Sequence, residues 1–431
     1  MRPRGNMPKE EGKPTFRIRY KDVPGKETAG KEMAESRTAE RETEYKISGE
    51  LKKIRPLDQG AMETAKRRFD SIAKPLGSLG ILETDLIRTA GIYEDSRGLA
   101  ERLSKAALVI MCADHGVVEE GVTQTGQEVT RIVAENFANG SACASIMCRE
   151  AGIDVFPVDM GMNCGMVGGR KLEPFCLYDS KVARGSRNLS KEPAMSLSEC
   201  ETAICAGIRL AGALKEKGYG ILLAGEMGIG NTTPASILAS LLTGLPLEKA
   251  IGRGAGLSDE GLEKKKRAAE RAVRRFASRY PKLMEDLGEG RKIRKEAGKE
   301  AAILLLSELG GYDLAGMAGL FLGGGIYRLP VVIDGSISAT AALLADRMAG
   351  GIAEFLFPSH ISTEPSGCAA LEALGFHAPL DLGMHLGEGT GAALYIPLLR
   401  MGAAVYEKMS TFEEISVTPY VDYEGEKEIK P

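Results

Sequence analysis

The stretch Tyr219-Gly-Ile-Leu-Leu-Ala-Gly-Glu-Met-Gly-Ile-Gly-Asn-Thr-Thr-Pro-Ala235 joins a short apolar run to a glycine-rich turn and then to a helix-like segment. The first six residues are typical of a buried strand, and Pro234 suits the first position of a helix. Strand, turn and helix in this order form the unit from which parallel α/β sheets are built. The stretch therefore predicts a sheet of this kind.

The same order recurs along the chain. Short apolar runs, each followed by a Gly- or Asp-containing turn, predict further buried strands at Ala106–Cys112, Ile153–Val158, Leu329–Ile333 and, more briefly, Phe355–Phe357. Strands separated by helices predict an α/β fold with a doubly wound, mostly parallel sheet and helices on both faces. Because ligands gather at the carboxyl ends of the strands in such sheets, the informative residues should follow the strands directly.

Two charged stretches differ from this pattern. Residues 1–50 hold 12 basic and 10 acidic residues with almost no apolar periodicity, which predicts a mobile extension. Docking of a partner is the alternative for this extension. The second stretch, Glu260 to Lys299, has apolar residues at helical spacing and predicts an exposed pair of helices.

Composition excludes several classes of protein. A hydrophobic fraction of 43% excludes wholesale disorder, and a net charge of -3 argues against a nucleic-acid binder. The longest uncharged run, Met227 to Leu247, contains an asparagine and two prolines, so no membrane span is expected. The eight cysteines form no CxxC pair and show no zinc spacing with histidine, which favours free thiols in a reducing compartment. We expect a soluble, cytoplasmic protein.

The glycine-rich turn has the form of a phosphate cradle. Gly228 and Gly230 would let backbone N–H groups converge on an anion, and Thr232 and Thr233 would add hydroxyl donors at a helix N-terminus. It is not a Walker A loop, because the chain contains no GxxxxGK[ST] sequence. A tight turn without a ligand is the alternative. Glu226 would repel an anion, so we expect it to face the part of the ligand that carries no phosphate.

Three other polar segments follow predicted strands or begin predicted helices. Asp114 and His115 follow the strand that ends at Cys112, and Asp313 lies in a segment of small residues. The turn that contains Ser359 and Ser362 is rich in hydroxyl groups. A structural role, as a helix cap or a packing residue, is the alternative for each of them.

Glu388 lies between two glycines at the entrance to an apolar helix. A carboxylate that is open to ligand but backed by an apolar wall has a raised pKa and suits a general base. A solvated turn glutamate is the alternative. The chain has no HExxH, GxSxG or paired-carboxylate motif, which disfavours zinc, serine and glycoside hydrolysis.

Six segments in order resemble one known family, that of the nicotinate-nucleotide–dimethylbenzimidazole phosphoribosyltransferases of cobalamin biosynthesis. The segments are Lys74–Gly80, Ala113–Gly116 with Glu120–Val122, Gly225–Pro234, Gly252–Gly256, Gly310–Gly316 and Leu386–Gly391. The resemblance runs from about Leu57 to about Tyr406 and does not cover residues 1–50.

The resemblance implies a reaction and an architecture. Nicotinate mononucleotide would give its 5-phosphoribosyl group to a benzimidazole nitrogen, yielding α-ribazole 5′-phosphate and nicotinate, without a metal or an organic cofactor. The enzyme would be a homodimer. A large α/β domain would span residues 101–394, and a small helical domain would combine residues 51–100 with 395–431.

The resemblance also implies roles for single residues. Glu388 would be the general base, Glu226 a second active-site glutamate near the sugar and base, and Lys265 a phosphate ligand that comes from the partner subunit. The remaining substrate-binding residues would be Asp114, Thr125, Gly228, Gly230, Asn231, Thr232, Thr233, Asp313, Ser362, Leu386 and Gly387, of which Leu386 would contact the aromatic base.

The acceptor base stays open. Family members can carry Ser and Gln where this chain has Thr125 and Val133, and loss of the Gln amide removes a hydrogen-bonding group. Benzimidazoles, adenine and phenols all remain candidate bases. A non-catalytic nucleotide-binding protein on the same scaffold is an alternative from a different class.

Overall fold

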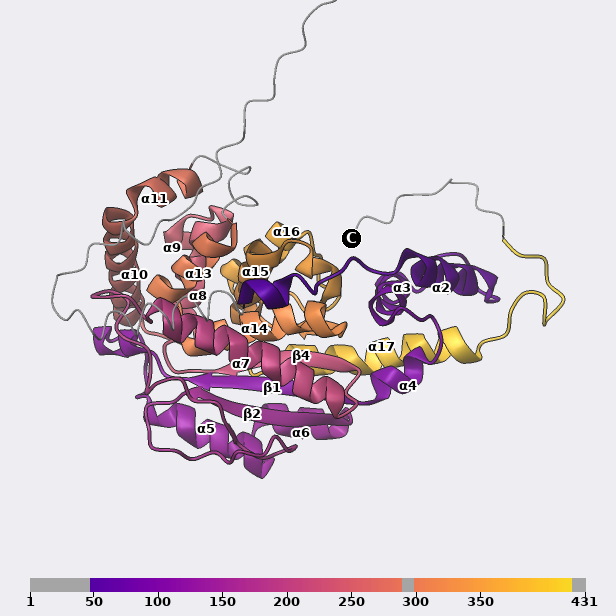
Figure 1. Ribbon diagram of the computed structural model, residues 1–431, viewed down its shortest axis with the longest axis horizontal. Coiled ribbons are helices and arrows are strands. Elements are labelled where there is room, and N and C mark those ends of the chain that lie inside the picture. Colours follow the sequence, from indigo (N-terminus) through magenta and orange to yellow (C-terminus); the bar gives the residue numbers. More distant parts are fainter. Residues whose placement is uncertain (1–46, 289–297, 421–431) are drawn as a thin grey trace, which may run out of the picture.

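The computed structural model describes residues 47–288 and 298–420. A six-stranded sheet forms its centre, in the order β3-β2-β1-β4-β5-β6 with every neighbouring pair parallel (Figure 1). The strands are β1 (Ala106–Ala113), β2 (Ile153–Gly161), β3 (Tyr178–Asp179), β4 (Ile221–Met227), β5 (Val331–Ile333) and β6 (Leu356–Pro358). The predicted doubly wound α/β fold is therefore confirmed.

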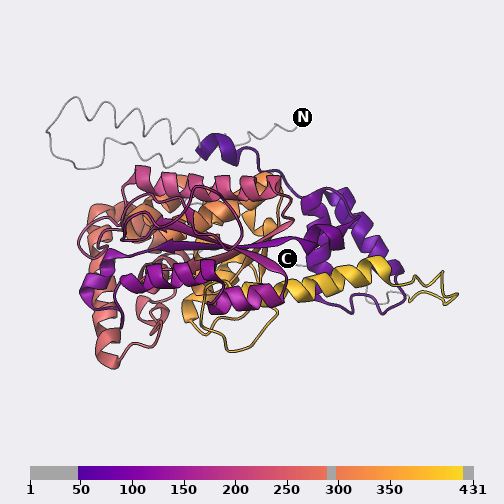
Figure 2. The same ribbon diagram turned by 90° about the horizontal axis from the view of Figure 1, so that it is seen from below.

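Helices cover both faces of the sheet (Figure 2). The α-helices are α2 (Gln59–Ser71), α3 (Ile81–Tyr93), α4 (Leu99–Ser104), α5 (Glu128–Asn139), α6 (Cys143–Glu150), α7 (Leu197–Glu216), α8 (Thr232–Thr243), α9 (Leu247–Ala250), α10 (Asp259–Arg279), α11 (Pro281–Gly288), α13 (Gly298–Leu309), α14 (Tyr312–Tyr327), α15 (Ser336–Ala349), α16 (Pro365–Leu374) and α17 (Thr390–Lys408); η2 (Gly116–Glu120) and η3 (Ile352–Phe355) are 3₁₀ turns. Helices α7 and α14 pack on one face, and α5, α6 and α17 on the other (Figures 1 and 2).

Strand β1 shows why the sequence signal was a continuous apolar run. All eight of its residues are buried. Val109 and Met111 belong to the apolar cluster under α7 and α14, whereas Leu108 and Ile110 belong to the cluster under α5 and α17. Successive side chains of a strand point to opposite faces, so a strand covered on both sides must be apolar throughout.

Several boundaries differ from the prediction. Strand β4 runs from Ile221 to Met227, so it starts two residues later and ends three residues later than expected. Because of the later end, it includes Glu226. Helix α8 begins at Thr232, so Pro234 is its third residue rather than its first. Strand β3 was not predicted, because it has only two half-buried residues and pairs with β2 alone.

Segments from the two ends of the chain lie side by side. Helices α2, α3 and α4 pack along the C-terminal half of α17 (Figure 1), and the Tyr395 hydroxyl donates to Asp85. The boundary expected at residue 394 falls inside α17. The apolar cluster that contains Phe69 and Leu86 also contains Leu108 of β1, so the helical part shares its core with the sheet.

The charged stretches are only partly described. Residues 1–46, most of the predicted extension, lie outside the described residues, as do residues 289–297 of the second stretch. Ile47 is 1% exposed and packs in the core, so the folded part starts no later than this residue, before the boundary at residue 50. Helix α10 is exposed on one side only, since Lys265 and Phe276 are buried. No helix within the described ranges is long and apolar enough to cross a membrane.

Candidate active site

The candidate site lies at the carboxyl edge of the sheet. In the order β3-β2-β1-β4-β5-β6 the strand sequence reverses between β1 and β4, and such a switch point opens a crevice between neighbouring strands. Asp114 follows β1, the glycine-rich loop follows β4, and Asp334 follows β5. The polar residues that follow these three strands therefore lie at one edge of the sheet.

The glycine-rich loop leads into helix α8 next to a buried lysine. Lys265 is 0% exposed, and its Nζ donates to Thr232 Oγ1 over 2.8 Å and to the Gly252 carbonyl over 2.9 Å. Burial lowers the pKa of Lys265 to about 8, and the nearby Glu364 carboxylate opposes this shift. A helix N-terminus, hydroxyl groups and an ammonium group thus meet at one place, which suits a phosphate.

Lys265 reaches the loop of its own chain. The hydrogen bond with Thr232 lies within one chain, and the part that the resemblance implies for this lysine across a subunit interface stays a prediction. Lys265 reaches Thr232 because the Gly252–Gly256 segment carries the chain from α9 past Thr232 to α10. Gly254 has φ +54°, and a Cβ at this position would lie 3.1 Å from Thr232 Oγ1.

Ser362 lies on the same side of the candidate site as Lys265. It is 6% exposed, and its Oγ accepts a hydrogen bond from the Glu364 amide. The Glu364 side chain in turn lies against Gly252, where an added Cβ would overlap its carboxylate. The turn after β6 is thus connected to the Lys265 region through Glu364.

Glu226 belongs to a buried polar chain. The Asn231 Nδ2 donates to Glu226 Oε2 and, over 3.2 Å, to Asp313 Oδ2. His115 Nε2 lies 3.1 Å from Asp313 Oδ1, although without the alignment of a hydrogen bond. Burial, followed by the negative charge of Asp313, raises the pKa of Glu226 to about 8, against the hydrogen bond from Asn231. Glu226 therefore holds a proton at neutral pH.

Glu388 has the environment that the sequence predicted for a general base. Burial raises the pKa of its carboxyl group, Asp334 raises this pKa further, and the Ala144 amide at the start of α6 opposes both. Its Oε2 is buried and has no hydrogen-bond partner in the part of the chain that the structure describes. One carboxylate oxygen is thus left without a hydrogen-bond donor from these residues.

Two close approaches bring the glutamates to the same place. A Cβ on Gly387 would lie 2.5 Å from Glu226 Oε1, and a Cβ on Gly225 would lie 2.9 Å from the Glu388 carbonyl oxygen. Neither position has room for a side chain, so glycine is required where the loop before α17 crosses the end of β4.

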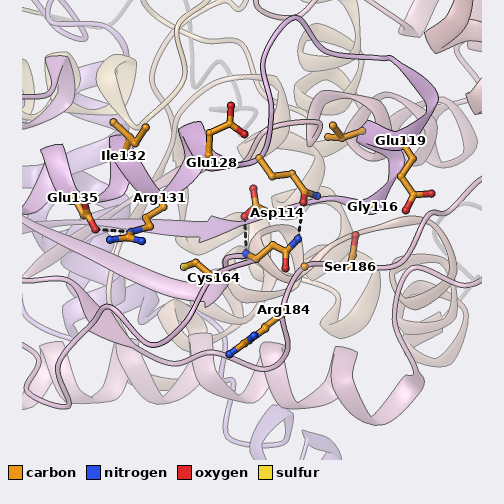
Figure 3. A pocket seen from close by; sticks show the side chains of 14 residues that line it. Asp114, Gly116, Glu119, Glu128, Arg131, Ile132, Glu135, Cys164, Arg184 and Ser186 are labelled. Carbon is orange, nitrogen blue, oxygen red and sulfur yellow. Dashed lines mark hydrogen bonds and ion pairs between the residues drawn. The ribbon is translucent and has the colours of Figure 1, made fainter.

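A cavity of about 880 Å³ adjoins this edge, between the end of β1 and helix α5 (Figure 3). Asp114 forms part of its wall and accepts a hydrogen bond from the Asn163 amide over 2.7 Å. Burial raises the pKa of Asp114, against hydrogen bonds from Thr130 and Asn163. Neither Glu226 nor Glu388 lines the cavity, so Asp114 faces a different space from the two glutamates.

Three predicted residues are less engaged. Thr125 is exposed in the loop before α5, and Leu386 is 53% exposed beside Glu388. Thr233 is fully buried in the first turn of α8, and its Oγ1 has no hydrogen-bond partner among the described residues. Their roles toward a ligand stay predictions.

Asp334 is the residue that the sequence analysis missed. It is 2% exposed, and its carboxylate accepts hydrogen bonds from the amides of Gly389, Gly391 and Ala392. It directly follows the predicted strand Leu329–Ile333, so the rule that selected Asp114 would also have selected Asp334.

Comparisons with known proteins find similar enzymes over most of the chain. A phosphoribosyltransferase family model matches residues 54–417. The nicotinate-nucleotide–dimethylbenzimidazole phosphoribosyltransferase of Acetivibrio thermocellus is 40% identical over 370 residues, which cover 86% of this chain and 97% of the relative. The protein of the same name from Clostridium acetobutylicum is 36% identical over 374 residues, covering 87% and 98%.

A solved structure is similar over the same range. The crystal structure of CobT from Thermus thermophilus superposes with a TM-score of 0.71 at 37% sequence identity. The match covers 84% of this chain and 100% of that chain.

Proposed function

The chain belongs to the nicotinate-nucleotide–dimethylbenzimidazole phosphoribosyltransferase family, and we propose that it transfers 5-phosphoribose from nicotinate mononucleotide to 5,6-dimethylbenzimidazole or a related lower-ligand base. The products are α-ribazole 5′-phosphate and nicotinate. This reaction supplies the nucleotide loop of cobalamin.

The chemistry needs one base and little acid. The bond between the anomeric carbon and the pyridinium nitrogen breaks, and its electron pair leaves with nicotinate, which needs no proton to depart. A benzimidazole nitrogen forms the new bond at the opposite face, so the configuration inverts from β to α. The other ring nitrogen then loses its proton to a base, which leaves the product ring neutral.

Glu388 is the base in this proposal. The observation that carries it is the buried, unpartnered Oε2 of a carboxyl group whose pKa is raised by burial. A raised pKa makes a carboxylate a stronger base. Leu386 and Gly387 lie in the same loop, where they would contact the aromatic ring.

Glu226 has a different part. With a pKa of about 8 it is protonated at neutral pH, so it can donate a hydrogen bond to the ribose or to the base. A neutral carboxyl group also avoids placing a second negative charge beside Glu388. Asn231 and Asp313 would hold this carboxyl group in place.

The phosphate would bind at the other end. Gly228, Gly230, Thr232 and Thr233 at the start of α8 would surround it, with Lys265 as the counter-ion. A phosphate would take over the hydrogen bond that Lys265 now donates to Thr232 Oγ1. Ser362 would complete this end through its link to Glu364.

The direct test is turnover. Purified protein is incubated with nicotinate mononucleotide and, separately, with dimethylbenzimidazole, benzimidazole, adenine and a phenol, and mass spectrometry measures ribotide and nicotinate formation. We expect α-ribazole 5′-phosphate with at least one benzimidazole. Binding of the nucleotide without any ribotide would favour the non-catalytic alternative, and product from the phenol alone would reassign the acceptor.

Two further properties belong to this proposal. The eight cysteines lie among the described residues and form no disulfide, which supports a cytoplasmic location. A homodimer is proposed from the family resemblance, and light scattering coupled to size-exclusion chromatography measures the assembly directly.

A further inference from the structure

We propose that Asp334 is a positioning residue that holds the Glu388 loop in its reactive conformation through three backbone amides. The inference rests on the proposed function, because it assigns to Asp334 a part in the action of Glu388.

Asp334 accepts hydrogen bonds from backbone amides that directly follow Glu388. Oδ2 accepts from the Gly389 amide over 3.0 Å, and Oδ1 accepts from the amides of Gly391 over 2.8 Å and Ala392 over 3.1 Å. These amides belong to the first turn of α17 and to the residue before it. A carboxylate that accepts several amides at a helix N-terminus is a strong anchor.

The loop needs such an anchor because its backbone is strained. Gly387, Glu388 and Gly389 all have positive φ values, of +84°, +60° and +83°. The two glycines adopt this conformation freely, but Glu388 carries a Cβ that disfavours it. A non-glycine residue keeps such a conformation only where its surroundings enforce it, and this pattern is typical of functional sites.

Neighbouring side chains restrict the backbone of the loop. A Cβ on Gly389 would overlap the side chain of Leu108, and a Cβ on Gly391 would overlap the ring of His360. The Asp334 amide itself donates to Ser338 Oγ over 3.1 Å, which fixes the aspartate to the start of α15. Asp334 therefore links the end of β5 and the start of α15 to the Glu388 loop.

Asp334 also contributes to the charge around Glu388. The groups that face the Glu388 region are Glu226 from β4, Asp334 from the end of β5, Cys148 and the Ala144 amide from α6, and His360 from the turn after β6. The negative charge of Asp334 raises the pKa of Glu388. Loss of that charge should make Glu388 a weaker base as well as a less well-placed one.

A double-mutant cycle tests this role. The four proteins are wild type, Asp334→Asn, Glu388→Gln and the double variant, each assayed for kcat and KM with nicotinate mononucleotide and the best acceptor base. In Asp334→Asn the amide NH₂ must face either Gly389 N–H or the two amides of the helix turn, so part of the anchor is lost. We expect kcat to fall by about 10- to 100-fold, because small displacements of a catalytic group have effects of this size.

The expected signature is non-additivity. In the Glu388→Gln background, Asp334→Asn should change kcat by less than about twofold, because there is no base left to position. The KM for nicotinate mononucleotide should stay within about twofold, since the Lys265 end is untouched, and the acidic limb of the kcat/KM profile should move to lower pH. Equal fold losses in both backgrounds, or an unchanged pH limb with a raised KM, would overturn the inference.

Asp381→Asn is the matched control, since it removes one exposed carboxylate from the same loop segment. It should leave kcat and the pH limb unchanged. Asp334→Glu serves as the second variant if Asp334→Asn does not fold: it keeps the charge but displaces the carboxylate, and we expect a lower kcat with an unmoved pH limb. Wild-type kcat in Asp334→Glu would overturn the inference, whereas no turnover by the wild type would overturn the proposed function and this inference together.

Discussion

Burial controls the chemistry of the two glutamates at the edge of the sheet. Both have raised pKa values, but the neighbours differ: Asp313 adds to burial at Glu226, and Asp334 adds to it at Glu388. Glu226 accepts a hydrogen bond from Asn231, whereas Glu388 keeps one oxygen that has no hydrogen-bond partner among the described residues. One glutamate is thus suited to hold a proton and the other to accept one.

Glu388→Gln should abolish most of the turnover. The amide keeps the shape of the side chain but cannot accept the ring proton, and removal of a general base costs about 10²–10⁴ in rate. Steady-state kinetics with dimethylbenzimidazole measures the loss, and calorimetry should show unchanged nucleotide binding. Asp381→Asn is the control, and near wild-type turnover by Glu388→Gln would remove the base assignment.

Glu226→Gln should change how stability depends on pH. The pKa of Glu226 is about 8 when folded and lies near its ordinary value of 4.5 when unfolded. Between these values the folded protein binds a proton that the unfolded chain has released, so wild-type stability falls as pH rises through this window and levels off above it. The full effect is on the order of 5 kcal/mol, since one pKa unit corresponds to about 1.4 kcal/mol.

The amide in Glu226→Gln resembles the protonated acid and does not titrate. The melting temperature of the variant should therefore gain on that of the wild type from about pH 5 to pH 8. Parallel curves for the two proteins across this range would show that Glu226 is not perturbed. Differential scanning calorimetry at closely spaced pH values provides the measurement.

Helix α10 shows how an element is fixed so that one of its residues can act. Arg271 forms an ion pair with Glu120 of η2, and Arg275 forms one with Glu308 of α13. These contacts tie the C-terminal half of the charged face of the helix to η2 and α13. The buried face then delivers Lys265 to the start of α8.

Lys265→Ala should weaken binding of nicotinate mononucleotide more than binding of the base. Charge-assisted bonds to a phosphate contribute about 1.5–3 kcal/mol, which corresponds to roughly 10- to 150-fold in Kd. Since the pKa of Lys265 is about 8, wild-type affinity should also fall as pH rises above 8, and the variant should lack this dependence. Isothermal titration calorimetry across this pH range measures both.

Lys264→Ala is the matched control for this experiment. Its ammonium group pairs with Glu260 on the exposed side of the same helix. The substitution should leave nucleotide affinity unchanged within about twofold, because exposed ion pairs contribute little. Equal losses in the two variants would indicate a general charge effect rather than a phosphate contact.

On the scale of the whole molecule, the two ends of the chain meet at helix α17. The N-terminal end of this helix follows Glu388, and its C-terminal half packs against α3 and α4 (Figure 1). Tyr395 and Asp85 join the two parts by a buried hydrogen bond. The helical part is thus joined to the Glu388 loop through one continuous helix.

The first 46 residues should be dispensable for catalysis. Their charge and lack of apolar periodicity give them little surface to bury, so ordering them would cost more than it returns. Truncation should start after residue 46, because Ile47 belongs to the core. We expect unchanged kcat, KM and assembly, measured by kinetics and by size-exclusion chromatography with light scattering.

The rival expectation is that this extension wraps a partner subunit. A truncated protein that is monomeric, or that shows a raised KM for the nucleotide, would support it. Truncation before Leu51, which also removes Ile47, serves as a second variant and should lower the melting temperature, because a buried side chain is lost from the core.

The order of apolar runs and turns was enough to predict the sheet and the edge at which the candidate residues lie. A continuous apolar run such as Ala106–Ala113 has to be buried on both faces, and a parallel sheet places the residues after each strand together. Asp114 and Glu226 were predicted in this way, whereas Asp313 was singled out in a segment of small residues and Glu388 by its flanking glycines before a helix. The predicted rise in the pKa of Glu388 was also correct in direction, because a glycine-flanked glutamate before an apolar helix loses water on one side.

Only the tertiary structure decided which of these residues touch. That Lys265 reaches Thr232 of its own chain depends on the path of the Gly252–Gly256 segment, which no local pattern encodes. That Asp334 holds the Glu388 loop depends on the chain returning to the sheet edge at Gly389, 55 residues later. Contacts between distant segments arise from packing, and local sequence signals carry no information about the partner.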